Sequence, residues 1–287
     1  MSEAPHRPSV LVGITTRNRA DVLPKAIASA LAQDYPALQV AVVDDASTDA
    51  TPSLRARFPQ VDWRRNDLVA GYRASRNELM RRPGFDYFVS LDDDAWFLRG
   101  DEISLAVARL ESDAATAGIA FDILSPDRPA AVERTSPRRV AVFIGCGHVL
   151  KLPPVAAAGY YADLPGPYGT EEKDLSLRLA DRGQLIDLLP GVHVWHDKAW
   201  SGRDWYPLHR SGVCNELVMT VRRCPLPDLL LVGPLKFASY LVYWLRHPAF
   251  CRAGIAGLGD FLRHFADAWR TRRPVRRDTF WRFRRLR

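Results

Sequence analysis

The sequence predicts an α/β fold in which a mostly parallel sheet is flanked by helices and followed by a helical C-terminal extension. Three observations predict this class. Short apolar runs alternate with amphipathic segments over the first half of the 287-residue chain, a pattern typical of parallel strands joined by helices. Polar or acidic clusters follow three of the apolar runs. Beyond about residue 215 the chain becomes amphipathic and then basic, so we expect a domain over residues 1–215 and an extension over residues 216–287.

The composition is that of a folded protein, with 47% hydrophobic and 25% charged residues. The net charge of +7 arises largely in residues 263–287, where arginine dominates, so it describes the tail rather than the main domain. The four cysteines form no CxxC pair, which argues against a disulfide framework or a zinc site. Residues 1–10 lack the apolar segment of a secretory signal, so we expect a cytoplasmic protein.

Strands and helices are expected to alternate up to residue 91. Leu23, Ile27 and Leu31 recur every four residues and so predict one apolar helix face. The Pro83-Gly84 pair ends a later helix. The expected order is strand 9–15, helix 22–33, strand 38–43, helix 48–57, strand 61–65, helix 72–82 and strand 85–91. Beyond these, we expect helix 101–118, strands 119–124 and 140–144, helix 171–181, and short strands 185–189 and 192–195.

Asp92, Asp93 and Asp94 directly follow the strand predicted over residues 85–91. Three adjacent carboxylates repel one another unless a cation is present, and alternate residues of an extended segment project similarly. Hard carboxylate oxygens suit Mg²⁺ or Mn²⁺, which can neutralise a diphosphate leaving group. A solvated acidic loop is the alternative. The position at a strand end, beside a second acidic strand end, favours the metal site.

Asp44 and Asp45 follow the strand predicted over residues 38–43. Ligands bind at the carboxyl ends of strands in such sheets, where a carboxylate can accept hydrogen bonds from a ribose or a base. The residue types at positions 45–49 are also typical of a turn and of a helix N-cap. Taken alone, these acids favour donor binding and a structural turn equally.

Several motifs occur together in one known family. The stretch VGITTRNRADVLPKAIASALAQDYPALQVAVVDDASTDAT resembles the opening of family 2 glycosyltransferases of the GT-A fold. SLDDDAWF resembles the metal-binding DxD motif of that family, and GYRASRNELM resembles the segment between the two. The match spans most of residues 9–215, in family order. It implies a GT-A, Rossmann-like nucleotide-diphospho-sugar transferase fold and sugar transfer from a nucleoside diphosphate donor.

The resemblance also implies roles for individual residues. Asp92, Asp94 and His196 are expected to hold Mn²⁺ or Mg²⁺, although a purely structural histidine is an alternative for His196. Gly145 and Gly147 match a loop beside the acceptor. Trp195 is an acceptor-side candidate because aromatic faces stack on sugars, but large aromatic residues also fill cores. The candidates on the donor side are Thr15, Arg17, Asp44, Asp45, Arg73, Arg76 and Asp93.

GTEEKDLSLRLADRG resembles the E-D-x-D-L-x-x-R segment of the family, whose second acid is usually the general base. The matching residue is Glu172, a glutamate where aspartate is usual, and Glu171 and Asp174 are the other catalytic candidates. Acids that complement a helix dipole are the structural alternative. A carboxylate that takes the acceptor proton contributes roughly 10²–10⁴-fold to the rate. Direct displacement would invert the anomeric configuration.

The C-terminal region joins apolar helices to a cluster of arginines. The apolar stretch over residues 229–245 is about 17 residues long and holds Pro234 and Lys236, so we expect a buried or membrane-surface helix rather than a span. Basic residues beside aromatic ones suit an anionic membrane surface, and we expect peripheral association with the inner face of the membrane. Helices that pack on the catalytic domain are the alternative. No nucleic-acid-binding motif accompanies the charge, so no nucleic-acid partner is expected.

Two other functions compete with sugar transfer to a hydroxyl of a cell-envelope or lipid-linked glycan. A nucleotidyltransferase also places acids at strand ends, but its first strand would be followed by a glycine-rich loop, which GITTRNR lacks. A catalytically impaired nucleotide-sugar-binding relative is the other alternative. The glutamate at position 172 favours it, and the intact acidic motifs argue against it.

Overall fold

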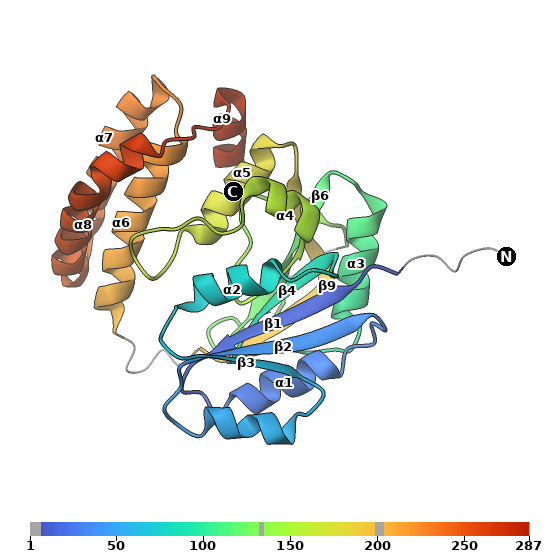
Figure 1. Cartoon of the computed structure of the whole chain (residues 1–287). Helices are drawn as coiled ribbons and strands as arrows, with labels where there is room; N and C mark the ends of the chain where they lie inside the picture. Colours follow the sequence, from blue (N-terminus) through green and yellow to red (C-terminus); the bar gives the residue numbers. More distant parts are fainter. Residues whose placement is uncertain (1–6, 132–134, 199–203, 287) are drawn as a thin grey trace. The chain divides into compact units, whose positions relative to one another are not determined.

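The computed structural model describes residues 7–131, 135–198 and 204–286 (Figure 1). Its contacts divide the chain into two compact units. The sheet unit comprises residues 1–160 and 183–198, and the helical unit comprises residues 161–182 and 199–287. The boundary predicted between residues 215 and 216 falls elsewhere, inside a helix of the second unit, and the division into a catalytic domain and an extension stays a prediction.

One mixed sheet forms the sheet unit, with the strand order β3-β2-β1-β4-β8-β6-β9-β5 and with β7 paired to β9. The first four strands in this order are parallel, as predicted. Beyond them β6 and β9 are parallel, but β8, β5 and β7 pair antiparallel with their neighbours, so only part of the sheet is parallel. The strands are β1 (Val10–Thr16), β2 (Leu38–Asp45), β3 (Asp62–Asn66), β4 (Tyr87–Asp92), β5 (Ala95–Phe97), β6 (Thr116–Leu124), β7 (Arg138–Val140), β8 (Gly147–Lys151) and β9 (Leu185–His196).

Helices cover both faces of this sheet, with α1 and α2 on opposite sides in Figure 1. Alternate residues of β1 explain the arrangement. Val12 and Ile14 belong to the main apolar core together with Ile27 of α1, whereas a side chain at Gly13 would collide with Phe88 and with Leu79 of α2. The helical segments of this unit are α1 (Leu23–Leu31), the 3₁₀ helix η1 (Thr51–Arg57), α2 (Tyr72–Met80), α3 (Glu102–Ser112) and α4 (Leu152–Ala158).

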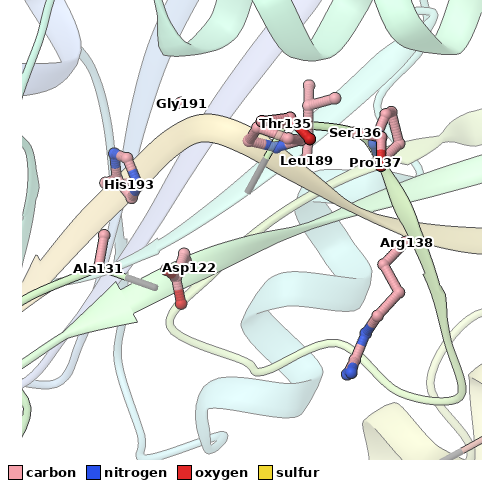
Figure 2. Close-up of a pocket in the computed structure, with 10 residues that line it drawn as sticks. Asp122, Ala131, Thr135, Ser136, Pro137, Arg138, Leu189, Gly191 and His193 are labelled. Atoms are coloured by element: carbon pink, nitrogen blue, oxygen red, sulfur yellow. The ribbon is translucent and has the colours of Figure 1, made fainter. Parts of the chain in front are cut away.

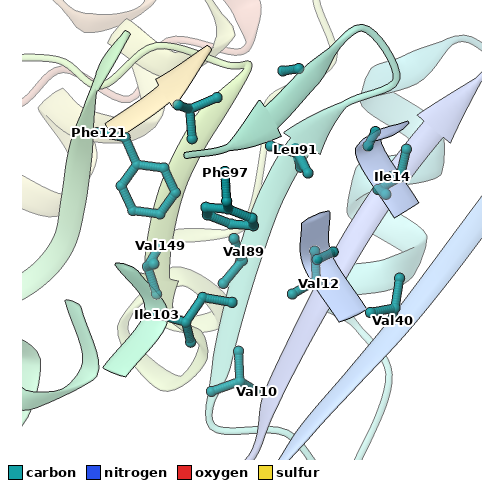
Figure 3. Packing of buried hydrophobic residues seen from close by; sticks show 14 of the residues in the cluster. Val10, Val12, Ile14, Val40, Val89, Leu91, Phe97, Ile103, Phe121 and Val149 are labelled. Carbon is teal, nitrogen blue, oxygen red and sulfur yellow. The ribbon is translucent and has the colours of Figure 1, made fainter. Parts of the chain in front are cut away.

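The main core includes residues of α1 and lies on the face of the sheet that this helix covers. Figure 3 shows the packing of part of this core. Val10, Val89 and Ile103 are fully buried there, although they come from β1, β4 and α3. Burying an aliphatic side chain of this size stabilises the fold by about 1.5–3 kcal/mol. The core therefore fixes the strands whose carboxyl ends carry the predicted site.

Five predicted elements differ from the structure. The apolar run over residues 140–144 is not a strand, because β7 ends at Val140 and the next strand begins at Gly147. The two short strands expected over residues 185–195 are one strand, β9, which continues through Gly191 at a positive φ of 78°. The helix expected over residues 48–57 is 3₁₀ and begins at Thr51. The helix expected to reach residue 118 ends at Ser112, and β6 begins at Thr116.

The helical unit packs its long helices through glycine contacts. A Cβ on Gly257 of α8 would lie 2.4 Å from the backbone oxygen of Arg210 in α6, and a Cβ on Gly254 would lie 2.1 Å from the Trp244 ring of α7. Helices can approach this closely only where no side chain intervenes. The elements are α5 (Glu171–Asp181), α6 (Trp205–Arg223), α7 (Asp228–Arg246), the 3₁₀ helix η2 (Pro248–Phe250), α8 (Cys251–Arg270) and α9 (Arg277–Arg285).

Helix α7 contains the apolar stretch that we expected to be either buried or at a membrane surface. Among the described residues it is the one helix long and apolar enough to cross a membrane, judged by length and composition alone. It is not a buried helix, since Leu230, Leu235 and Leu245 are largely exposed. The part of the expectation that placed it in a core is therefore wrong.

Candidate active site

The carboxyl ends of the parallel strands bring the predicted donor and metal residues to one edge of the sheet. Thr15 of β1 is in register with Asp92 of β4 on one side and with Val43 of β2 on the other. Asp44 of β2 is in register with Thr16. Parallel pairing therefore unites three motifs that are separated by dozens of residues in the sequence.

Asp92, Asp94 and His196 meet at this edge. Antiparallel pairing places Ala95 of β5 opposite His196 of β9, which brings the imidazole to the acidic motif. His196 Nε2 lies 3.0 Å from Asp94 Oδ1 and 3.9 Å from Asp92 Oδ2. The other ring nitrogen, Nδ1, is buried with no hydrogen-bond partner among the described residues. Two carboxylates and an imidazole converging at these distances are a suitable ligand set for a divalent cation.

The electrostatics of the acidic motif also fit a cation. The pKa of Asp93 is raised to about 7, mainly by burial and also by the charges of the adjacent Asp94 and Asp92. Burial also raises the pKa of Asp94, but the hydrogen bond and charge of His196 outweigh it, and the net pKa is lowered. Carboxylates crowded into such a site are stabilised when a positive charge joins them.

Two arginines already contribute positive charge to the motif. Arg76 of α2, buried beside the ring of Tyr72, forms an ion pair with Asp92. Arg19 lies 4.0 Å from Asp93 and 3.9 Å from Asp94, with almost half of its side chain exposed. Arg76 is one of the predicted donor-side residues, and here it pairs with the acidic motif. Arg19 is a further site residue that the sequence motifs do not indicate, although it lies in the polar loop after β1.

The carboxylates of Asp44 and Asp45 are engaged within the chain. Asp45 accepts hydrogen bonds from the backbone N–H groups of Ala70 and Gly71 and from the Asn66 side chain, at 2.8–2.9 Å. Asp44 accepts from the backbone of Ser47 and from Arg65. These contacts favour the structural alternative, in which the acids order the loops after β2 and β3. Donor binding by them stays a prediction.

The loop after β1 is joined to the loop after β2. The Asn18 backbone N–H donates to Ser47 Oγ at 2.9 Å, and Asn18 Oδ1 accepts from the Thr48 backbone at 2.7 Å. Asn18 and Ala46 both have positive φ, near 55°, which is uncommon for residues with a Cβ. The donor-side candidates Thr15 and Arg17 lie at the end of β1 and in the loop after it, so this strained pair of loops adjoins them in the chain.

The acceptor-side candidates lie in different surroundings. Gly147 is the first residue of β8, opposite Leu91, and a Cβ there would come within 2.9 Å of Ile123. Gly145 lies in the turn before it. Trp195 stacks on Trp96 with ring centroids 6.3 Å apart. Neighbouring residues of a strand point to opposite faces, so Trp195 and His196 leave β9 in opposite directions, and the structure does not bring Trp195 to the carboxylates.

The three catalytic candidates share the first turn of α5 in the helical unit. Glu171 and Asp174 are each only 1% exposed, whereas Glu172 is half-buried. The Asp174 carboxylate accepts from Arg178 at 2.7 Å and from Arg223 at 2.7 and 3.4 Å. A carboxylate enclosed by two guanidinium groups is a poor proton acceptor, because they stabilise its charged form. These contacts favour a structural role for Asp174. Glu172 is the most accessible of the three acids.

Asn215 of α6 holds the loop that leads to these acids, and the sequence did not indicate it. Its side-chain nitrogen donates to the carbonyls of Gly166, Tyr168 and Gly169 at 3.0 Å each, and its oxygen accepts from the Gly166 N–H. The loop ends in Thr170, whose φ of 82° is strained for a residue with a Cβ. A buried amide with every hydrogen bond used is a rigid support for this turn.

A separate cavity of about 800 Å³ opens beside β6 and β9 in the sheet unit (Figure 2). Asp122, Arg138 and His193 line it, and Asp122 forms an ion pair with Arg128 at 2.6 Å. The described lining residues include none of the predicted site residues.

Comparisons with known proteins show which family and which fold this chain resembles. Residues 11–139 match the family model described as glycosyl transferase family 2. Over 119 residues the chain is 37% identical to the succinoglycan biosynthesis protein ExoO of Rhizobium meliloti (strain 1021). That match covers 41% of this chain and 33% of the relative, so the chain spans about a third of the length of that protein.

Solved structures share the fold at low sequence identity. The mannosyltransferase PcManGT from Pyrobaculum calidifontis, in complex with GDP-Man and Mn²⁺, has a TM-score of 0.60 at 20% identity over 91% of this chain and 76% of that one. S. aureus TarS 1-349 in complex with UDP-GlcNAc has a TM-score of 0.66 at 14% identity, over 88% and 80% of the two chains. The predicted GT-A fold with C-terminal helices is confirmed.

Proposed function

Because residues 11–139 match the model of glycosyl transferase family 2, we propose that this chain is a metal-dependent, inverting glycosyltransferase that uses a nucleoside-diphosphate sugar. The observation that carries the proposal is the meeting of Asp92, Asp94 and His196 at the carboxyl edge of the sheet. Ligands of open α/β sheets bind at this edge. A nucleotidyltransferase gains no support from the structure or from the comparisons.

Donor binding is proposed for the loops around the acidic motif. Asp92, Asp94 and His196 would hold Mn²⁺ or Mg²⁺, which neutralises the charge that develops on a diphosphate leaving group. Arg19, whose guanidinium faces Asp93 and Asp94, adds a cation on the exposed side of the motif. Guanidinium groups recognise phosphate oxygens with paired hydrogen bonds. The structural neighbours in complex with GDP-Man and Mn²⁺ or with UDP-GlcNAc support this class of donor.

Glu172 is the proposed general base. Of the three acids in the first turn of α5 it is the most accessible, since Glu171 and Asp174 are buried and Asp174 is paired with two arginines. A base must reach the acceptor hydroxyl and must be able to take up a proton. Removal of that proton during direct displacement would yield the inverted anomer.

A glycan hydroxyl is the proposed acceptor. The name of the 37% identical relative, a succinoglycan biosynthesis protein, supports a precursor of a cell-envelope polysaccharide or a lipid-linked glycan. The exposed leucines of α7 and the arginines of the C-terminal segment support a position at an anionic membrane surface, where such acceptors are found.

The metal centre can be tested without an acceptor, through slow hydrolysis of the donor. Purified protein is incubated with a panel of UDP-, GDP- and dTDP-sugars and with Mn²⁺ or Mg²⁺, and the free nucleoside diphosphate is measured. We expect release from one donor that EDTA abolishes and that Asp94→Asn lowers by roughly 10²-fold or more, because a metal contact supplies several kcal/mol of charge stabilisation.

Asp127→Asn is the matched control, since it removes an exposed carboxylate elsewhere in the sheet unit. Equal release by wild type and Asp94→Asn would contradict the metal role. If calorimetry detects no binding of any panel donor with metal, the glycosyltransferase proposal itself fails.

A further inference from the structure

Cys146 brings a thiol to the metal centre. Asp92, Cys146 and His196 each offer one ligand atom, and these atoms all lie within 4.8 Å of one another. The Cys146 side chain is only 2% exposed, and the electrostatic influence of both Asp92 and Asp94 reaches its sulfur. This buried thiol has no part in the proposed transfer reaction.

The fold holds Cys146 in this place through the pairing of β4 with β8. The backbone N–H of Asp92 donates to the Cys146 carbonyl at 3.4 Å, and the next residue, Gly147, is in register with Leu91. Because Gly147 packs on Ile123 and Phe121 without room for a Cβ, the turn that carries Cys146 is fixed against the core. Backbone pairing and core packing therefore hold the thiol at the acidic edge of the sheet.

We propose that Asp92, Cys146 and His196 form a binding site for a thiophilic divalent cation such as Zn²⁺ or Cd²⁺, overlapping the site proposed for Mn²⁺ or Mg²⁺. Sulfur, imidazole nitrogen and carboxylate oxygen are the ligand types that Zn²⁺ prefers, whereas Mg²⁺ prefers oxygen alone. On binding, the sulfur lone pair forms the metal bond while the S–H bond breaks and its proton passes to solvent. No electron is transferred.

The two ligand sets share Asp92 and His196 and differ in the third group. Asp94 completes a harder set with its carboxylate, and Cys146 completes a softer set with its sulfur. Because the two sets share two ligands, binding of one cation excludes the other, so a thiophilic dication would displace Mn²⁺ or Mg²⁺. We therefore expect trace Zn²⁺ to inhibit the enzyme. This last consequence rests on the proposed function; the binding site does not.

Titration with Cd²⁺ tests the site without any nucleotide or activity. Thiolate coordination to Cd²⁺ produces an ultraviolet sulfur-to-metal charge-transfer band. We expect the band in the wild type and in Cys251→Ser, and we expect it to be lost in Cys146→Ser. Cys251 is the matched control because it is a partly exposed thiol of the helical unit. The affinity for Cd²⁺ relative to Mn²⁺ should fall by at least ~10–100-fold in Cys146→Ser, the range known for the loss of outer-shell partners alone.

Asp92→Asn changes a second ligand and keeps the thiol, so it tests the site even if Cys146→Ser does not fold. It should retain the far-ultraviolet circular dichroism of the wild type, and it should weaken the Cd²⁺ band. A band of equal strength in Cys146→Ser, or no band in the wild type, would overturn the site. If the wild type shows the Cd²⁺ band but releases nucleoside diphosphate from no donor, the result counts against the proposed function alone.

Discussion

At the scale of single residues, α5 shows how two neighbouring acids acquire different roles. Asp174 is enclosed by Arg178 and Arg223, and burial lowers the pKa of Arg178 although the charge of Asp174 opposes this shift. Glu172, two residues earlier, is half-buried. The sequence motif contains both acids, and only their surroundings separate structural support from the proposed base.

Asp174→Ala should destabilise the protein by about 3–5 kcal/mol, because it leaves two mostly buried guanidinium groups without their carboxylate. Urea denaturation followed by circular dichroism measures this loss. Glu172→Gln is the comparison variant: it should unfold like the wild type, yet sugar transfer should fall by roughly 10²–10⁴-fold. A stable Asp174→Ala, or an active Glu172→Gln, would reverse the roles assigned to these acids.

At the scale of elements, α6 supports both the acidic turn and α8. Asn215 holds the loop over residues 166–169, and Arg210, more than a turn earlier, presents the carbonyl on which Gly257 packs. One helix thus connects the proposed base to the packing of the C-terminal helices within the helical unit.

Asn215→Asp should loosen the loop before Glu171, because a carboxylate would face three carbonyl oxygens where an amide now donates. We expect faster amide hydrogen exchange over residues 166–170 and a lower kcat with little change in the KM for the donor. Gln60→Glu, at an exposed position of the sheet unit, is the control for a general effect of the added charge. Unchanged exchange in the loop would show that Asn215 does not position it.

Gly257→Ala should destabilise α8 by about 1–3 kcal/mol, since its Cβ would lie 2.4 Å from a backbone oxygen that cannot rotate away. Gly259→Ala in the same helix is the matched control. Its Cβ would meet only the Arg263 guanidinium at 3.9 Å, so we expect a gain of about 0.4–1 kcal/mol from reduced chain entropy. Thermal unfolding distinguishes the two, and equal effects would mean that α6 and α8 do not pack through Gly257.

At the scale of the whole molecule, apolar surface and positive charge both concentrate in the helical unit. Leu230, Leu235 and Leu245 of α7 and Leu262 of α8 are more than half exposed. Arginines dominate the segment from residue 263 to the C-terminus. An apolar surface with basic residues nearby suits the interface of an anionic bilayer.

Vesicles with and without anionic phosphatidylserine test this proposal by co-sedimentation. We expect binding to the anionic vesicles, weakening with added salt, because the arginines act through screened electrostatic attraction. Leu235→Glu combined with Leu245→Glu should abolish it. Leu68→Glu is the control, because Leu68 is 82% exposed but belongs to the sheet unit. Binding that persists in the double variant would assign attachment to another surface.

The sequence by itself determined the strand–helix alternation up to residue 92 and the three polar strand ends. These follow from local periodicity and from the placement of charge, which are readable along the chain. It also determined the candidate metal residues, through motifs whose order needs no tertiary contact to recognise. It could not separate a strand from an apolar loop over residues 140–144, since a short apolar run is consistent with both.

Only the tertiary structure decided what each polar group faces. The pairing of β5 with β9 brings His196 to Asp94, and the turn before β8 brings Cys146 to Asp92, across about 50 residues or more of chain in each case. The spacing of the cysteines argued against a zinc site, because spacing describes only partners that are near in sequence. Enclosure of Asp174 by Arg223 is likewise a long-range contact. Burial and long-range contacts set the charge and role of these groups, and both exist only once the chain has folded.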